Sequence, residues 1–216
     1  MKICVIIPTY NEEKNIVDVI EKVKNYVQKI IVVDDGSNDN TTKKAKETGA
    51  IVLKHIVNMG KGSAAKTGCD YAYLHKYEKI ILLDGDGQHN PKEIPEFIEQ
   101  LKHADVVFGY RKFNKNMPWV FRFGNQSINW VTKILYGINI KDTQGGYRAF
   151  NTKVYKKIRW KASDYSMESE MIANVGKHKL KYSQVPIQTI YGDKYKGTTI
   201  VDGLKIVFNM FTWRLR

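Results

Sequence analysis

An apolar run that ends in two closely spaced acids is the part of this sequence with the clearest potential for chemistry. Residues 79–83 are a lysine and four aliphatic residues, and Asp84, Asp86 and Gln88 follow at two-residue spacing. Carboxylate and amide oxygens are the ligands that Mg²⁺ and Mn²⁺ take in proteins, usually together with substrate phosphates. The pattern therefore predicts metal and phosphate chemistry, with these three side chains as the metal ligands.

Other interpretations of the polar stretches are weaker. An acidic turn is the plainest alternative, since Asp and Gly are the commonest turn residues. An EF-hand is excluded, because His89 stands where the loop needs a glycine and Pro95 stands where it needs a glutamate. Residues 60–63 read Gly-Lys-Gly-Ser, but they lack the earlier glycine of a phosphate-binding P-loop.

The acids at 84 and 86 must be positioned by the end of a buried strand, because a continuous apolar run fits a strand that is covered on both faces. In open α/β sheets, ligands bind just beyond the carboxyl ends of such strands. A second apolar run, at 29–33, also ends in acids, Asp34 and Asp35. The patterns predict strands at 3–7, 29–33, 51–55, 79–83 and 104–109, with helices between them. This alternation predicts an α/β fold, a three-layer sandwich with a mainly parallel central sheet.

The second half of the chain differs in character. Aromatic and basic residues are dense over 112–136, which indicates either a core helix with a solvated basic face or a segment at a membrane interface. A helix is predicted near 165–178, and a strand near 185–187 that the proline at 186 places at a sheet edge. We expect a catalytic domain over 1–200, with a donor half to about 110 and an acceptor half over 111–200. Residues 201–216 form a predicted amphipathic helix with its apolar stripe through Phe208 and Phe211.

Composition limits the partners. Lysine and arginine number 35 against 22 acids, a formal charge of +13, which favours anionic partners such as phosphorylated substrates or acidic lipid. Charge alone gives only nonspecific nucleic-acid binding, and no RNA- or DNA-binding motif is present, so no nucleic acid is expected. We expect no signal peptide and no membrane span in these residues. The two cysteines are expected to be core residues.

Five segments together carry a family resemblance. They are Pro8-Thr-Tyr-Asn-Glu12, Val33-Asp-Asp-Gly-Ser37, Gly60-Lys-Gly62, Asp84-Gly-Asp-Gly-Gln-His89 and Gly145-Gly-Tyr-Arg148. In this order the chain resembles the family-2 glycosyltransferases of the GT-A fold, most closely the polyprenyl- and dolichyl-phosphate sugar transferases such as dolichyl-phosphate mannose synthase. The resemblance implies inverting, metal-dependent transfer of a hexose from GDP-mannose or UDP-glucose to a polyprenyl phosphate. It also implies peripheral binding at the cytoplasmic face of a membrane, directly or through a membrane-anchoring subunit.

The resemblance also implies roles for individual residues. The donor would be bound by residues of the first strands, the acidic turn and the late loop: Pro8, Tyr10, Glu12, Val33, Asp35, Asp84, Gly85, Asp86, Gln88, Arg111 and Lys194. The residues implied in catalysis are Asp86, Arg111, Arg122 and Glu170, with the two arginines on the acceptor phosphate and the developing charge. The chain departs from the family at its late loop, where Lys194 replaces the expected arginine and Ile200 the expected lysine.

Two further hypotheses remain open from the sequence. In the first, the acceptor is a saccharide or protein hydroxyl and Glu168 or Glu170 is the catalytic base. In the second, the domain binds sugar nucleotides or nucleic acid without catalysis. The two glutamates are two residues apart on a predicted helix, so their side chains cannot point the same way. For a phosphate acceptor, the expectation is that Glu170 orients the sugar or the arginines and that Glu168 lies at the surface.

Overall fold

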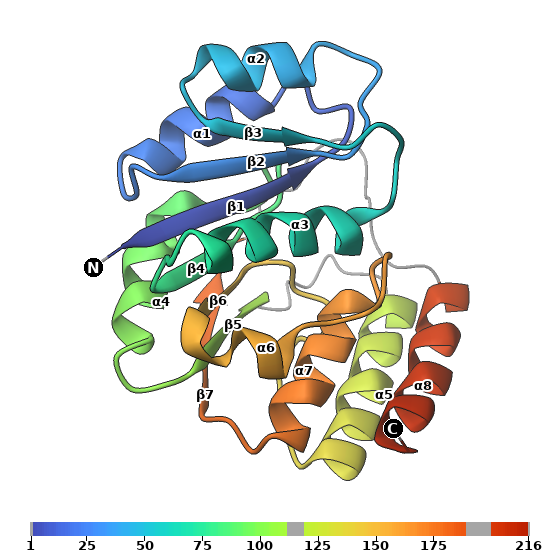
Figure 1. The fold of residues 1–216 in the computed structure, drawn as a ribbon. Coiled ribbons are helices and arrows are strands. Elements are labelled where there is room, and N and C mark those ends of the chain that lie inside the picture. The colour runs from blue at the N-terminus through green and yellow to red at the C-terminus, as the bar shows by residue number, and fades with distance from the viewer. Residues whose placement is uncertain (1, 112–118, 189–199, 216) are drawn as a thin grey trace.

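The computed structural model describes residues 2–111, 119–188 and 200–215. The strands are β1 (Ile3–Thr9), β2 (Ile30–Asp34), β3 (Ile51–Lys54), β4 (Lys79–Leu82), β5 (Val106–Arg111), β6 (Arg148–Asn151) and β7 (Tyr182–Ile187). The helices are α1 (Ile16–Lys24), α2 (Thr41–Glu47), α3 (Lys61–Leu74), α4 (Ile94–Gln100), α5 (Trp119–Tyr136), α6 (Tyr155–Ile158), α7 (Met167–Lys177) and α8 (Ile200–Leu215), with 3₁₀ turns at Pro91–Glu93 and Thr152–Val154. Figure 1 shows their arrangement.

Within these residues the strands form one sheet in the order β3-β2-β1-β4-β6-β5-β7. The pairs β1–β2, β1–β4, β2–β3 and β5–β7 are parallel, whereas β6 runs antiparallel between β4 and β5. The predicted three-layer α/β sandwich with a mainly parallel sheet is confirmed. The strand that contains Pro186 lies at the sheet edge, as expected.

The two faces of the sheet are both buried, which explains the continuous apolar runs in the sequence. Along β1, Cys4 and Ile6 join the core beneath α3, α6 and α7. Val5 and Ile7 alternate with them and join the core beneath α1, α2 and α4. The parallel strands β1, β2 and β4 therefore carry their carboxyl ends to a single edge, between two layers of helices.

A third apolar cluster joins α5, α7 and α8, which lie side by side in Figure 1. Met210 and Trp213 of α8 are buried in it, whereas Phe208 and Phe211 are exposed. The apolar stripe predicted through Phe208 and Phe211 is therefore exposed, and the packing with α5 and α7 buries a different apolar face of the helix. No helix in the described ranges is both long and apolar enough to cross a membrane.

Candidate active site

The carboxyl ends of β1, β2 and β4 bring the predicted polar residues to one edge of the sheet. The register pairs Pro8 of β1 with Val33 of β2, and Asp35 follows β2 directly. The acidic turn beginning at Asp84 follows β4, which is the other neighbour of β1. The structure therefore brings the predicted donor-binding residues of these three strands together, as parallel topology requires.

The centre of this edge is an ion-pair network formed by Lys61, Asp84 and Glu168. The Lys61 Nζ lies 2.9 Å and 3.0 Å from the two carboxylate oxygens of Asp84 and 3.0 Å from Glu168 Oε1. Lys61 is the first residue of α3, and Glu168 lies in the first turn of α7, so the network joins two helices to the end of β4. Burial would raise the pKa of Asp84, but the Lys61 ammonium holds it below its usual value.

The network is packed against glycine backbone. A Cβ added at Gly146 would lie 2.6 Å from Asp84 Oδ2 and 3.0 Å from Lys61 Nζ, so only glycine allows the chain to pass this close. Glu168 is 2% exposed, and its Oε2 is buried with no hydrogen-bond partner in the described part of the chain. The expectation that Glu168 lies at the surface was wrong, because α7 turns this side chain toward Lys61.

Asp86 lies in the same turn as Asp84. Its Oδ1 accepts a hydrogen bond from the Gln88 N–H at 3.0 Å. Burial and the negative charge of Asp84 raise the pKa of Asp86 above its usual value. Two crowded carboxylates with an amide side chain nearby fit a divalent cation, which would relieve their repulsion. No group of three or more His, Cys, Asp or Glu side chains arranged for a metal exists among the described residues.

His89 lies at the end of the acidic turn and contacts its first residue. Its Nδ1 accepts a hydrogen bond from the Asp84 N–H at 3.3 Å, and its ring stacks on Tyr147 with the centroids 5.2 Å apart. Burial lowers the pKa of His89. The histidine therefore supports the backbone of the turn as a neutral ring.

Asp35 is bound on both carboxylate oxygens. Oδ1 accepts from His55 Nδ1 at 2.7 Å and from the Met59 N–H at 2.9 Å, and Oδ2 accepts from the Gly60 N–H at 2.8 Å. Nε2 of His55 is 2.9 Å from the Thr67 hydroxyl. Asp35 thus fixes the loop between β3 and α3, the loop that delivers Lys61.

The other predicted donor-binding residues of the first strands surround this position. Tyr10 is exposed beyond β1, and Glu12 is buried with Oε2 accepting from the Asn15 side chain at 2.8 Å. Val33 is fully buried in the core beneath α3, so its side chain is part of the packing. Gly85 packs on Thr9, whose side-chain oxygen would lie 3.0 Å from an added Cβ.

Arg111 is held in place at the end of β5. Its Nε and Nη2 donate to the two carboxylate oxygens of Asp142 at 2.7 Å and 3.1 Å, a bidentate pair. Arg122 lies in α5, but its side chain is outside the described part of the structure, as is all of Lys194. The roles implied for Arg111, Arg122 and Lys194 stay predictions.

Arg148 connects several backbone segments beside the site. Its guanidinium is buried and donates to the carbonyl oxygens of Thr143, Gly145 and Glu168. Burial lowers its pKa to about 10. The arginine therefore ties the glycine-rich return before β6 to the first turn of α7, and so positions Gly146 and Glu168 together.

Glu170 has a different environment from Glu168. Its Oε2 accepts from the backbone N–H groups of Lys161 and Ala162 at 3.0 Å and 2.9 Å. The Ser163 carbonyl accepts from the Gly62 N–H at 2.8 Å, so this same loop covers the start of α3. Glu170 therefore fixes a loop in this structure, and its predicted catalytic role stays untested.

The sequence did not predict that Lys61, Glu168 and His55 would lie at this edge of the sheet. The Gly60-Lys-Gly62 segment is one of the five segments that carry the family resemblance, and this was the sequence signal that pointed to Lys61. The glycines themselves make room for the loop at 162–164: a Cβ at Gly60 or Gly62 would lie 2.4 Å from a carbonyl oxygen of that loop.

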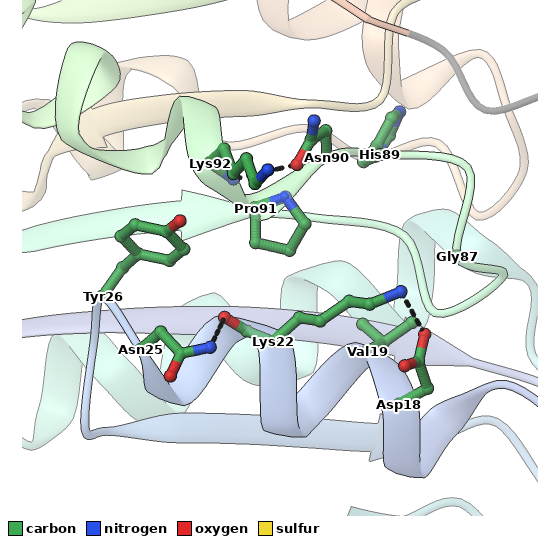
Figure 2. Close-up of a pocket in the computed structure, with 10 residues that line it drawn as sticks. All are labelled: Asp18, Val19, Lys22, Asn25, Tyr26, Gly87, His89, Asn90, Pro91 and Lys92. Carbon is green, nitrogen blue, oxygen red and sulfur yellow. Dashed lines mark hydrogen bonds and ion pairs between the residues drawn. The ribbon is translucent and has the colours of Figure 1, made fainter.

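A separate hollow of about 290 Å³ lies behind the acidic turn (Figure 2). Along one wall, Lys22 of α1 donates to Asp18 of the same helix at 2.6 Å, and Gly87 and His89 form part of the facing wall. Asp84, Asp86 and Lys61 do not line it. The hollow is therefore distinct from the edge where the acids and Lys61 meet.

Comparisons with known proteins agree with this architecture. Residues 4–159 match the family model described as glycosyl transferase family 2. The chain is 34% identical to the UDP-N-acetylglucosamine–dolichyl-phosphate N-acetylglucosaminyltransferase of Methanococcus voltae, covering 99% of this chain and 96% of that protein. It is 28% identical to the polyprenol monophosphomannose synthase of Mycolicibacterium smegmatis, covering 98% and 86%.

Among solved structures, the chain is similar to glucosyl-3-phosphoglycerate synthase from Mycobacterium tuberculosis in complex with Mg²⁺ and UDP, with a TM-score of 0.79 and 17% identity over 98% of this chain and 79% of that one. This likeness supports the GT-A fold that the sequence implied. The predicted family and the predicted enzyme class are both confirmed. The chain belongs to glycosyl transferase family 2 and is a glycosyltransferase related to the dolichyl- and polyprenyl-phosphate sugar transferases.

Proposed function

We propose that this enzyme transfers a hexose, with inversion, from a nucleoside diphosphate sugar to a polyprenyl phosphate in a metal-dependent reaction. The observation that carries the proposal is that both candidate bases are already engaged: Glu168 is paired with Lys61, and Glu170 holds backbone N–H groups. A phosphate acceptor is an anion at neutral pH and needs no general base. The names of the relatives point to the same acceptor class.

The donor end is suited to a diphosphate leaving group. Asp84, Asp86 and Gln88 would hold Mg²⁺ or Mn²⁺, which would neutralise charge on the diphosphate oxygens. Lys61 adds a fixed positive charge at this edge, and its side chain is 21% exposed. Such a preorganised cation stabilises the charge that grows as the glycosidic bond breaks.

The acceptor end would be served by arginines. The bidentate pair with Asp142 fixes the orientation of the Arg111 guanidinium. The planar fork of arginine matches a phosphate group, so Arg111 can orient the acceptor, and Arg122 of α5 is the second proposed contact.

Transfer to a hydroxyl acceptor is the second candidate. The unpartnered Oε2 of Glu168 favours it, since that oxygen has capacity to accept a proton. The Lys61 ion pair opposes it, because the ammonium already occupies Oε1 of Glu168 at 3.0 Å.

Access to a lipid acceptor requires contact with a bilayer, and the α5–α8 face is the surface that we propose for it. We define this face by Trp130 and Ile134 of α5 and by Phe208 and Phe211 of α8, all exposed. Exposed Lys133 and Arg214 follow on the same helices. Aromatic and basic residues together are typical of helices that lie at an anionic membrane surface. A membrane-anchoring subunit on this face is the alternative.

The test is a sugar-transfer assay with radiolabelled UDP-glucose and GDP-mannose, each supplied with Mg²⁺ or Mn²⁺ and a short polyprenyl phosphate. The expected result is label in the organic phase with one donor, abolished by a chelator. Donor binding with no transfer to the lipid phosphate would contradict the proposed acceptor. Transfer that is unaffected by the chelator would contradict the metal.

A further inference from the structure

The hydrogen bonds of Asp35 bear on a question that the family leaves open, namely which base the donor carries. An ionised carboxylate has about four acceptor positions, two on each oxygen. Both positions on Oδ1 are used, by His55 Nδ1 at 2.7 Å and by the Met59 N–H at 2.9 Å. Within the described part of the chain Oδ2 accepts one bond, from the Gly60 N–H at 2.8 Å, so one position on Oδ2 is left.

The state of His55 follows from its partners. The ionised Asp35 only accepts, so the imidazole carries its proton on Nδ1 and donates it to Oδ1. Nε2 is then an acceptor, and the Thr67 hydroxyl at 2.9 Å donates to it. Thr67 lies within α3, so the hydrogen bonds from Thr67 to His55 and from His55 to Asp35 connect the carboxylate to a helix.

The surroundings of Asp35 restrict what can reach the remaining position. The Asp35 side chain is 4% exposed, so its own protein contacts cover most of it. Beside it, Val57 and Met59 are apolar and more than half exposed, and Val57 lies directly over Gly36. An apolar surface next to one hydrogen-bond acceptor suits the edge of a flat base better than a ribose hydroxyl.

We propose that His55, held by Thr67, orients Asp35 so that a single acceptor position remains on Oδ2, and that this position selects a uridine nucleotide over a guanosine nucleotide. Uracil offers one N–H, at N3, between two carbonyl groups. Guanine offers adjacent N1–H and N2–H groups that pair with both oxygens of a carboxylate, and Oδ1 has no position left for the second. A guanine at this site keeps an unpaired buried donor, which is costly. The inference rests on the proposed function, because it takes Asp35 as a residue that binds the donor.

The test is isothermal titration calorimetry with UDP and with GDP in the presence of Mg²⁺. The wild-type enzyme is expected to bind UDP at least about tenfold more tightly than GDP. Equal binding of the two nucleotides, or tighter binding of GDP, would overturn the selection.

Two substitutions of the same residue test the positioning role of His55. His55→Asn places an amide N–H about where Nδ1–H lies, so it keeps the bond to Asp35. His55→Gln reaches only the position of Nε2 and loses that bond. We expect UDP affinity within about threefold of wild type for the Asn variant and about tenfold lower for the Gln variant, with GDP affinity changed little in either.

Thermal unfolding of both variants separates this effect from misfolding. A His55→Gln enzyme that is folded and binds UDP as the wild type does would overturn the role of His55. Thr67→Val, which keeps the side-chain volume, is expected to cause a smaller loss than His55→Gln, because Asp35 keeps its direct contact.

The outcomes also separate this inference from the proposed function. Selective UDP binding without transfer to polyprenyl phosphate would support the inference and contradict the proposed acceptor. A wild-type enzyme that binds neither nucleotide would overturn both.

Discussion

The edge of the sheet where β1, β2 and β4 end, which we call the donor edge because we propose that it binds the donor, differs from the α5–α8 face in how its side chains are covered. At the donor edge the charged groups are bound to one another: Lys61 pairs with Asp84 and Glu168, and Asp35 pairs with His55. At the α5–α8 face, large apolar groups have no cover, with Trp130 65% and Phe208 70% exposed.

The side chains of the first region are held in place before any ligand binds, whereas those of the second region are exposed to solvent. Groups already fixed by neighbours need little rearrangement when charge develops on a leaving group, which is the condition for electrostatic catalysis. Large exposed apolar side chains that are grouped on neighbouring helices are typical of a face that binds a membrane or a partner. Substitutions at the donor edge should therefore lower the rate of sugar transfer, and substitutions on the α5–α8 face should weaken binding to a membrane or a partner.

The largest expected effect comes from Asp86→Ala. Loss of the carboxylate proposed to bind the metal should lower the transfer rate by about a thousandfold or more. Folding should be retained, because the substitution removes a buried charge whose pKa is raised by burial and by Asp84. The measurements are sugar transfer and melting temperature. Asp18→Ala, which removes a surface pair on α1, is the control; a fully active Asp86→Ala enzyme would contradict the metal site.

The two glutamates of α7 should differ in kind. Glu168→Gln weakens the contact that holds Lys61 and should lower kcat about tenfold with little change in melting temperature. Glu170→Gln weakens the acceptor of two backbone N–H groups, so it should lower the melting temperature while sparing most of the activity. The matched pair is assayed for both quantities. Near-complete loss of transfer in a folded Glu170→Gln enzyme would instead support a hydroxyl acceptor.

The α5–α8 face should be sensitive in membrane binding alone. Phe208→Ser combined with Phe211→Ser should weaken binding to vesicles of anionic lipid roughly tenfold or more, because two exposed aromatic groups no longer enter the interface. Nucleotide binding should not change. Vesicle cosedimentation measures the first and calorimetry the second. Unaltered cosedimentation would remove this face as the membrane contact and favour a separate anchor.

The smallest effect is on the pH dependence of stability through Asp142. Burial raises the pKa of Asp142, but Arg111 lowers it more, and the folded value lies below the usual 3.8. A depressed carboxylate stabilises the fold above the unfolded pKa, and this contribution is lost as the pH falls through the folded value. The difference in melting temperature between wild type and Asp142→Asn should therefore be largest near neutral pH and should shrink below about pH 4. A difference that stays constant with pH would contradict the ion pair.

The sequence was sufficient for the sheet and for the edge where the site lies. Apolar runs that end in acids predict where parallel strands deliver carboxylates, and β1, β2 and β4 do so. The position of the antiparallel β6 between β4 and β5 was not predicted, because the order of strands in a sheet depends on pairing between segments far apart in the sequence.

The site contacts that the sequence could not predict are long-range. Lys61 and Glu168 meet because Arg148 fixes the start of α7 and glycine at 146 allows close approach. The helical spacing of Glu168 and Glu170 required different directions, but only packing decides which one faces the site. The same limit applies to α8, where apolar residues on two faces leave the choice to its contacts with α5 and α7. Lys194 lies outside the described residues.

The most direct test of the central claim compares two acceptors that differ only in the phosphate group. Wild-type enzyme is supplied with the labelled sugar nucleotide that it binds, with Mg²⁺, and with either a polyprenyl phosphate or the corresponding polyprenol. The account predicts label on the phosphate only, since Glu168 pairs with Lys61 and Glu170 holds backbone N–H groups. Comparable transfer to the polyprenol, lost in Glu168→Gln, would contradict the account and identify Glu168 as a catalytic base.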